Sequence, residues 1–211
     1  MPRTEEANQR IRAAQRAKIL ESARRVFAQK GMAATITDIA ADAQISVGLA
    51  YRYFADKEAI FSALVKQMIP TGSAEFQQLL ELPGTPGKRL AVLISRILAA
   101  RGRREPLEAY QILALHAEAM PDDVRELLGA RYQMLLATMR QLIVEAQATG
   151  EVVPGDPDQL AAVVWACLDG LTRWAVRDPE QFNAYVPDAE IFMRLFALSP
   201  EEKSNSEHPP T

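Results

Sequence analysis

Apolar residues recur three or four positions apart along almost the whole chain, and segments in which apolar and polar residues strictly alternate are nearly absent. The first pattern places apolar side chains along one face of an α-helix, whereas alternation would indicate a half-buried strand. Proline and glycine residues interrupt the pattern, and both residue types end helices. We therefore predict an all-α fold.

The interruptions divide the chain into short and long predicted helices. The short helices are expected at 37–43, 46–54 and 56–69, with Thr37, Ser46 and Asp56 as their N-terminal caps. The longer helices are expected at 9–29, 86–101, 105–119, 122–149, 157–177 and 187–198. Residues 71–87, which are rich in Gly, Pro and Thr, are expected to form a loop with room for one helical turn. The polar tail at 201–211 is expected to be disordered.

Charge is distributed unevenly along the 211 residues, which are enough for two domains. Residues 1–66 contain 11 Lys/Arg and 7 Asp/Glu, whereas residues 67–211 contain 13 and 20, so the net charges are +4 and −7. This asymmetry indicates that only the N-terminal part meets a polyanion. Cys167 is the single cysteine, which excludes disulfide frameworks and cysteine-rich zinc sites. No apolar run is long enough to span a membrane, and we expect a cytoplasmic protein. We also expect neither a metal site nor a cofactor.

The signatures of common enzyme classes are incomplete in this chain. His116-Ala117-Glu118 matches the H-x-E of zinc deaminases, but no P-C-x-x-C follows it. Leu113 stands three residues before His116, where a di-iron helical bundle needs a glutamate. Neither a G-x-S-x-G sequence nor a phosphate-binding glycine loop is present. We therefore predict that the protein is not an enzyme.

Residues 35–61 contain the strongest functional pattern. Two predicted helices of about seven residues, joined by a three-residue turn, form a helix-turn-helix. The residues expected to face inward are Ile39, Ala40, Ala43, Ile45, Ala50, Tyr53 and Phe54. In such motifs the second helix enters the major groove of DNA and the first crosses the backbone. The outward residues of 46–53 are therefore candidates to contact DNA.

Each outward side chain of this second helix suits a particular DNA contact. Arg52 could pair with guanine or a phosphate, and Tyr51 could donate to a phosphate. Val47 and Leu49 could touch thymine methyl groups. Gly48 would let the backbone approach DNA closely.

Further contacts are predicted at the edges of the motif. Thr37, at the start of the first helix, and Lys57, after the Asp56 cap, are placed to hold phosphates at helix N-termini. The complete predicted DNA-binding set is Thr35, Thr37, Ser46, Val47, Gly48, Leu49, Tyr51, Arg52, Tyr53 and Lys57. Arg10, Arg12 and Arg16 form either a solvated helix face or an arm that reaches DNA, and the sequence leaves both readings open.

Residues 19–65 resemble the N-terminal DNA-binding domain of the tetracycline-repressor (TetR) family. The matching features are Ala23, Phe27, Gly31, Thr37, Ile39, Ala40, Tyr51, Tyr53-Phe54 and Lys57-Glu58. The rest of the chain resembles the family in its length, its helix pattern and the sequence Asp169-Gly170-Leu171. One departure is Gln44, in a turn that usually carries glycine, because a left-handed non-glycine residue costs about 1 kcal/mol.

The resemblance implies a three-helix DNA-binding domain at 1–55 and a C-terminal helical bundle for ligand binding and dimerisation at 56–200. It implies a ligand pocket between the helices at 86–177. The candidate lining residues are Tyr110, His116, Met120, Met139, Trp165 and Asp169. The alternative to lining a pocket is, for the aromatic and methionine side chains, packing in the hydrophobic core. For Asp169 the alternative is an ion pair with Arg173.

Dimerisation through the last two helices is also implied by the resemblance. The stretch from Ala161 to Leu168 contains no polar residue, which agrees with burial of this helix on two sides. Burial within a monomer is the alternative. Two reading helices related by a two-fold axis would match a palindromic operator.

We therefore expect a sequence-specific transcriptional regulator, a homodimer released from a palindromic DNA operator by an unknown small-molecule effector. Release would be a population shift, with the helix that carries Leu64, Val65 and Met68 as the lever. One alternative is an activator of the same fold, or a regulator controlled by a protein partner. Another is a helical small-molecule carrier or enzyme whose helix-turn-helix is vestigial.

Overall fold

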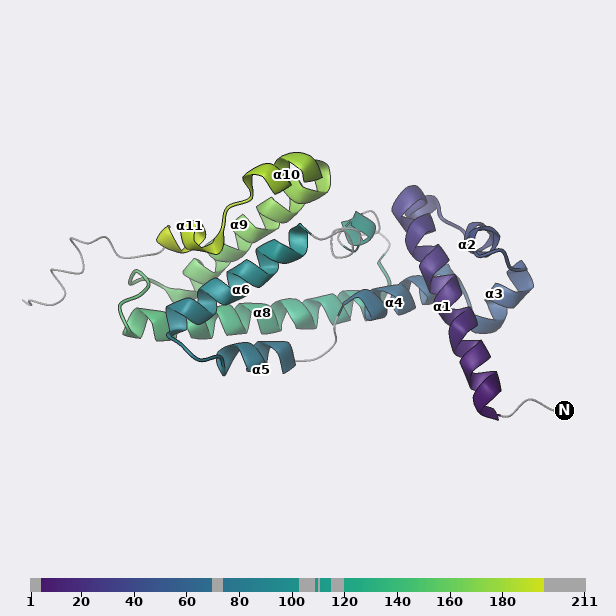
Figure 1. Cartoon of the computed structure of the whole chain (residues 1–211), viewed down its shortest axis with the longest axis horizontal. Coiled ribbons are helices and arrows are strands. Elements are labelled where there is room, and N and C mark those ends of the chain that lie inside the picture. Colours follow the sequence, from purple (N-terminus) through teal and green to yellow (C-terminus); the bar gives the residue numbers. More distant parts are fainter. Residues whose placement is uncertain (1–4, 70–73, 103–108, 110, 115–119, 196–211) are drawn as a thin grey trace, which may run out of the picture. The chain divides into compact units, whose positions relative to one another are not determined.

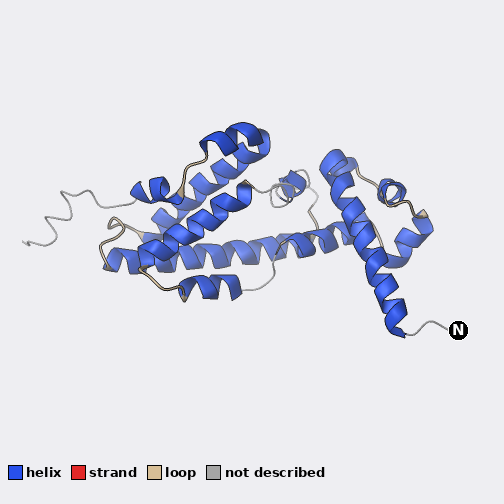
Figure 2. Cartoon of the chain, viewed as in Figure 1, coloured by secondary structure: helices blue, strands red, loops and turns tan. Residues whose placement is uncertain are grey.

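The computed structural model describes residues 5–69, 74–102, 109, 111–114 and 120–195, and within these residues every regular element is a helix (Figures 1 and 2). The helices are α1 (Glu5–Lys30), η1 (Gly31–Ala33), α2 (Ile36–Asp42), α3 (Val47–Tyr53), α4 (Lys57–Met68), α5 (Ala74–Leu80), α6 (Pro86–Arg101), α8 (Asp122–Ala148), α9 (Pro157–Arg177), α10 (Pro179–Tyr185) and α11 (Ala189–Arg194). The predicted all-α fold is confirmed. Most of the helix predicted at 105–119, and the tail at 201–211, lie outside the described residues.

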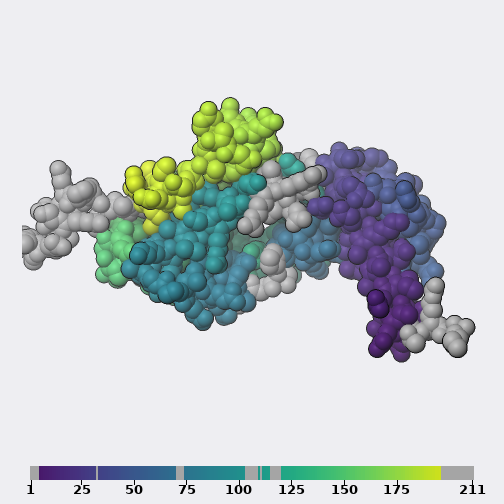
Figure 3. Space-filling model, viewed as in Figure 1, coloured from purple at the N-terminus to yellow at the C-terminus, as the bar shows by residue number. Residues whose placement is uncertain are grey.

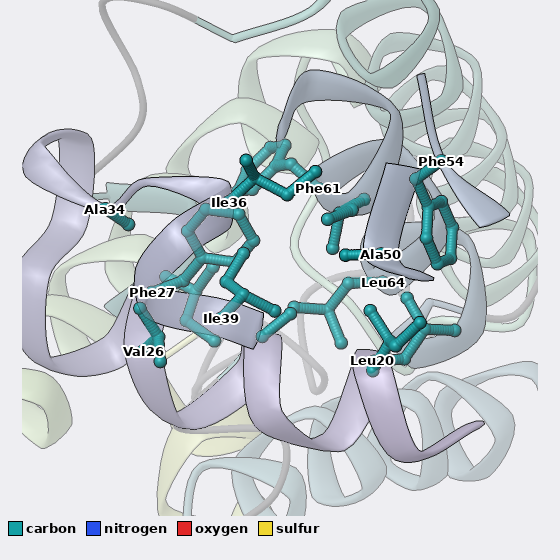
Figure 4. Close-up of a cluster of buried hydrophobic side chains, with 14 of the residues drawn as sticks. Leu20, Val26, Phe27, Ala34, Ile36, Ile39, Ala50, Phe54, Phe61 and Leu64 are labelled. Carbon is teal, nitrogen blue, oxygen red and sulfur yellow. The ribbon is translucent and has the colours of Figure 1, made fainter. Parts of the chain in front are cut away.

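The described residues of 1–71 and 108–128 form one compact unit. Its core joins α1, α2, α3 and α4, and Figure 4 shows side chains from these helices pointing toward one another. Phe27 and Phe61 meet edge to face, with ring centroids 5.4 Å apart. Val124, from the first turn of α8, is buried in the same core. Each large apolar side chain buried here stabilises the unit by about 1.5–3 kcal/mol.

Caps fix where the short helices of this unit begin. Ser46 accepts a hydrogen bond from the Leu49 amide (3.1 Å) and Asp56 accepts one from the Ala59 amide (2.7 Å), which confirms both predicted caps. The predicted Thr37 cap is wrong, because Thr35 caps α2. Thr35 and Asp38 form a reciprocal capping box, in which each side chain accepts from the other residue's backbone amide.

Thr35 and Thr37 provide a matched pair of substitutions that tests this cap. Thr35→Ala is expected to lower the free energy of unfolding by about 1 kcal/mol, because the Asp38 amide loses the Thr35 hydroxyl as its acceptor. Thr37→Ala, at an exposed position inside the helix, is expected to leave stability nearly unchanged. Urea unfolding curves of the two variants measure both values. The reverse order of effects would contradict the assignment of the cap.

The described residues of 72–107 and 129–211 form a second compact unit. Its core includes Ile94 of α6, Met139 and Leu142 of α8, and Leu168 of α9. The buried residues of α9 recur every three or four positions, namely Ala161, Val164, Leu168, Thr172 and Ala175. One side of α9 thus packs in the core, while the other side, including Val163, is exposed.

Among the described residues of this second unit, Arg101 is the charged residue that is buried, with only 4% of its surface exposed. Its Nε donates to the Thr172 hydroxyl (2.8 Å) and one of its terminal nitrogens donates to the Ile97 carbonyl (2.7 Å). The Thr172 hydroxyl in turn donates to the Leu168 carbonyl (2.8 Å). These bonds connect the end of α6 to the middle of α9.

Three helices of the second unit differ from the prediction. Residues 71–87, expected as a loop with room for one turn, contain the seven-residue helix α5. The prediction that Asp178-Pro179 only stops a helix is incomplete, because α10 starts there. Asp178 accepts from the Gln181 amide (3.0 Å), and proline is tolerated at the first helical position. The last helix begins at Ala189, after the Asp188 cap, rather than at residue 187.

The predicted domain boundary at residue 55 does not coincide with the division into two units. α4 lies beyond that boundary, yet its Ile60, Leu64 and Val65 are buried in the first core. The predicted boundary follows the end of the helix-turn-helix and so leaves α4 in the following domain. The separate roles of the two parts, DNA binding and ligand binding, stay a prediction.

Candidate nucleic-acid interface

The turn between α2 and α3 holds the two helices in a helix-turn-helix. Gln44 has a φ of 52°, so it adopts the left-handed conformation expected of it. Its amide donates to the Ala41 carbonyl and the Ile45 amide donates to the Ala40 carbonyl, both at 3.0 Å. This pair of bonds is a Schellman motif, which ends α2 with a left-handed residue that is usually glycine.

Substitution of Gln44 tests the cost of this conformation. Gln44→Gly is expected to raise the free energy of unfolding by about 0.5–1 kcal/mol, since relief of the left-handed strain exceeds the greater chain entropy of glycine. Gln44→Ala keeps the strain and is expected to show no gain. Thermal unfolding of the three proteins measures the order. A loss of stability in the glycine variant would show that Gln44 contributes interactions that outweigh its strain.

The reading helix α3 has an inner face and an outer face. Ala50 is fully buried and Phe54, which follows the helix, is 6% exposed, as predicted for inward residues. Tyr51 is 53% exposed and Arg52 is exposed as well. Among the described residues, the side chains of Tyr51 and Arg52 have no hydrogen-bond or ion-pair partner. Both are therefore available to a ligand.

Val47 corrects one part of the prediction for α3. It was expected to point outward, but it is partly buried and packs against the first core. It lies three residues before Ala50, and residues at this spacing share a face of a helix. Leu49 is also partly buried, whereas Gly48 is exposed and a side-chain carbon at its position would meet no atom within 4 Å. Tyr53, predicted both as an inward residue and as a DNA contact, is partly buried against the core.

The remaining predicted DNA-binding residues lie at helix starts. The hydroxyl groups of Thr35 and Ser46 are occupied as caps. Thr37 is exposed as the second residue of α2. Lys57 is partly buried as the first residue of α4. The unit therefore places all these residues on the helix-turn-helix or at the start of the next helix.

Basic side chains of α1 neutralise the acidic residues of α2. Lys30 pairs with Asp38 at 2.5 Å and Arg25 pairs with Asp42 at 2.7 Å. The bond from Lys30, together with the bonds from Thr35, lowers the pKa of Asp38 to about 2. The bond from Arg25 likewise lowers the pKa of Asp42. These pairs neutralise part of the negative charge of α2.

Asp123 makes a contact that sequence reasoning missed. Its carboxylate accepts from the Ser62 hydroxyl at 2.9 Å and from Lys66 Nζ at 2.7 Å. The bond from Lys66 is the largest cause that lowers the pKa of Asp123. The contact ties the first turn of α8 to α4, over a separation of about 60 residues that no local pattern reveals.

The predicted ligand-binding residues belong to both units or lie outside the described residues. Tyr110 and His116 lie outside the described residues. Met120 packs against the first core, whereas Met139 is fully buried in the second. Trp165 is partly buried on α9 in the second unit. The ligand pocket therefore stays a prediction.

Two of these ligand candidates make contacts within the second unit. The Trp165 ring contacts that of Tyr132, with centroids 5.0 Å apart. Asp169 pairs with Arg173 at 2.9 Å, which is the alternative considered for it from the sequence. Both side chains thus have partners within the second unit.

The arrangement of α1 to α4 defines a DNA-binding protein of the helix-turn-helix class. Residues 19–64 match the family model of bacterial regulatory proteins of the tetR family. Residues 86–187 match the model of the C-terminal part of BetI-type transcriptional repressors. The chain belongs to the TetR family, and it is a DNA-binding transcriptional regulator.

Individual relatives cover most of the chain. The HTH-type transcriptional regulator BetI of Brucella suis is 27% identical over 187 residues, which are 85% of this chain and 86% of the relative. A TetR/AcrR-family regulator from Thermobifida fusca is 26% identical, with a TM-score of 0.58 over 86% of this chain and 93% of its own. A TetR-family regulator from Agrobacterium tumefaciens, 18% identical, has a TM-score of 0.69 over 89% of this chain and 100% of its own, and shows the shared fold.

One further finding concerns membranes. Among the helices in the described part of the chain, none combines the length and the apolar composition needed to cross a lipid bilayer.

Proposed function

We propose that this regulator is a repressor that acts as a homodimer. Residues 46–53 of each copy read one half of a palindromic operator, and a small molecule releases the dimer from DNA. The observation that carries the proposal is the outer face of α3, where Tyr51 and Arg52 are exposed and have no partner among the described residues. An exposed arginine on a reading helix is suited to the two acceptors of a guanine edge. Operator binding places the protein in the cytoplasm, with the chromosome.

Exposed apolar residues on α9 and α11 support the dimer. Val163 is 51% exposed, Ile191 is 54% exposed and Leu195, at the end of α11, is 70% exposed. Large apolar side chains that one unit leaves exposed favour burial against another molecule. A second copy is the partner that a palindrome requires, with two reading helices about 34–36 Å apart.

The match to the BetI-type repressor model over 86–187 supports repression and control through the C-terminal helices. FadR of Bacillus subtilis, a neighbour with a TM-score of 0.54 and 20% identity, was solved in complex with stearoyl-CoA. A fold of this kind therefore accommodates a small molecule. The chemical class of the effector of this protein is left open.

The contact of Asp123 with α4 gives this control a structural route. α8 contributes Val124 to the first core and Met139 to the second. Ser62 and Lys66 of α4 are bonded to Asp123, near the start of α8. A change in α8 on effector binding would be passed to α4 and so to the reading helix, by a shift between two populated states.

Selection of duplexes from a random DNA pool tests the proposal. The purified full-length protein is incubated with the pool at moderate salt, and bound duplexes are recovered and sequenced over several rounds. We expect a palindrome whose half-site centres are one helical turn, about 34–36 Å, apart or a multiple of it. Recovery of sequences with no common motif would reject operator binding and favour a carrier with a vestigial motif.

A further inference from the structure

The first half of α1 lies outside the core of its own unit. The buried residues of this helix begin at Ile19, and the residues before it are exposed or at most partly buried. Figures 1 and 3 show these N-terminal turns, in purple, continuing beyond the helices against which the rest of α1 packs. The segment 7–18 contains four basic residues and no acidic residue; the basic residues are Arg10, Arg12, Arg16 and Lys18. Glu5 and Glu6 precede it in the first turn.

The faces of this projecting segment differ. Arg12 lies seven residues, about two helical turns, before Ile19, so both side chains lie on the same face of α1. That face is buried at Ile19 and Ala23. Nearer the N-terminus, beyond the core, the same face carries the exposed Arg12 instead of an apolar residue. Arg10 lies on the opposite face, about 160° away from Arg12. The inner face of α1 therefore continues past the core as a charged surface.

Arg16 connects this surface to the reading helix. Its guanidinium lies 5.2 Å from the ring centroid of Phe54, the residue that follows α3. A guanidinium stacked on an aromatic ring is held in place by a cation–π interaction. Arg12 is one helical turn before Arg16 and forms no ion pair with any described residue. The charged surface thus begins at the C-terminal end of α3 and continues the proposed DNA interface.

We propose that Arg12 contacts a backbone phosphate of DNA beside the base pairs that α3 reads. Arg16, stacked on Phe54, holds this part of α1 next to the reading helix. The proposal rests on the proposed function, because it assumes that α3 faces DNA. Three observations support DNA as the occupant: the positive charge of the segment, its continuity with the reading helix, and the absence of an ion-pair partner for Arg12 among the described residues. A phosphate contact sets position and affinity but reads no base.

The test compares Arg12→Ala with Arg10→Ala, which remove the same charge from opposite faces of one helix. Binding of full-length protein is measured by fluorescence anisotropy across a range of salt concentrations. The probes are a duplex recovered in the random-pool selection and a scrambled duplex of the same composition. Arg12→Ala is expected to lower affinity about tenfold on both duplexes and to reduce the slope of log affinity against log salt by about one per subunit. Arg10→Ala is expected to match the wild type, and Arg12→Lys to retain the wild-type slope.

The outcomes separate this proposal from the proposed function. Equal behaviour of the Arg12→Ala and Arg10→Ala proteins, with the wild type still preferring the selected duplex, would overturn the Arg12 contact alone. If the pool yields no motif, the scrambled duplex still tests the contact, because phosphate binding needs no sequence. Binding to neither duplex would overturn both. Both arginines are exposed, and alanine favours helix, so loss of folding is not expected to obscure the comparison.

Discussion

Val163→Glu is expected to convert the dimer to a monomer and to reduce operator affinity by two orders of magnitude or more. Val163 is half exposed on α9, on the side turned away from its own core. In a dimer through this face, each copy would bury an unpaired carboxylate, at a cost of about 2–5 kcal/mol. A monomer presents only one reading helix and loses the second half-site. Sedimentation of the protein and titration of an operator duplex measure the two effects.

Gln133→Glu is the matched control for this change, because it adds the same charge at an exposed polar position of α8. We expect it to remain dimeric with unchanged operator affinity. The far-ultraviolet spectra and unfolding temperatures of both variants show whether the monomer is still folded. A Val163→Glu protein that stays dimeric would place the dimer interface elsewhere on the molecule.

Arg52→Ala is expected to lower operator affinity by about 10- to 100-fold and to relax the preference at one base pair of each half-site. A bidentate arginine contact to guanine contributes about 1–3 kcal/mol of discrimination. Arg52 is exposed on α3 and held by no described neighbour, so the loss reflects DNA contact and not folding. Titration of operator duplexes with each base substituted in turn measures the affinity and the preference.

Arg10→Ala again serves as the control, since it removes an arginine from the outer face of α1. Affinity reduced equally on every sequence would identify Arg52 as a phosphate contact and contradict its role in base reading. Unchanged affinity would remove Arg52 from the interface.

Local rules predicted much of this fold. The bounds of α6 and α9 follow from Pro86 and Pro157 at their first positions, because caps and prolines act over a few residues. The same local signals gave a wrong prediction where two residues could each cap the same helix. Thr37 was preferred over Thr35, although only Thr35 lies three residues before Asp38 and can complete a capping box. α10 was missed because Asp178 both ends one helix and caps the next.

For the candidate site, the sequence predicted the exposed residues and the turn but not the contacts between distant residues. The exposure of Tyr51 and Arg52 and the left-handed Gln44 follow from motif spacing, and the structure agrees. The stacking of Arg16 on Phe54 and the bonds to Asp123 join residues 38 or more positions apart. Contacts at such distances depend on how helices pack, which periodicity does not determine. The ligand pocket was inferred from resemblance, and a methionine such as Met139 packs equally well in a core.

The central claim is that α3 reads a specific DNA sequence. Its most direct test is the ratio of affinities for the selected operator and for a scrambled duplex of the same composition, both measured at physiological salt. The account predicts a ratio of about 10³ or more. A ratio near one, with affinity that only falls as salt rises, would show that the protein binds the DNA backbone without reading sequence, and would contradict the account.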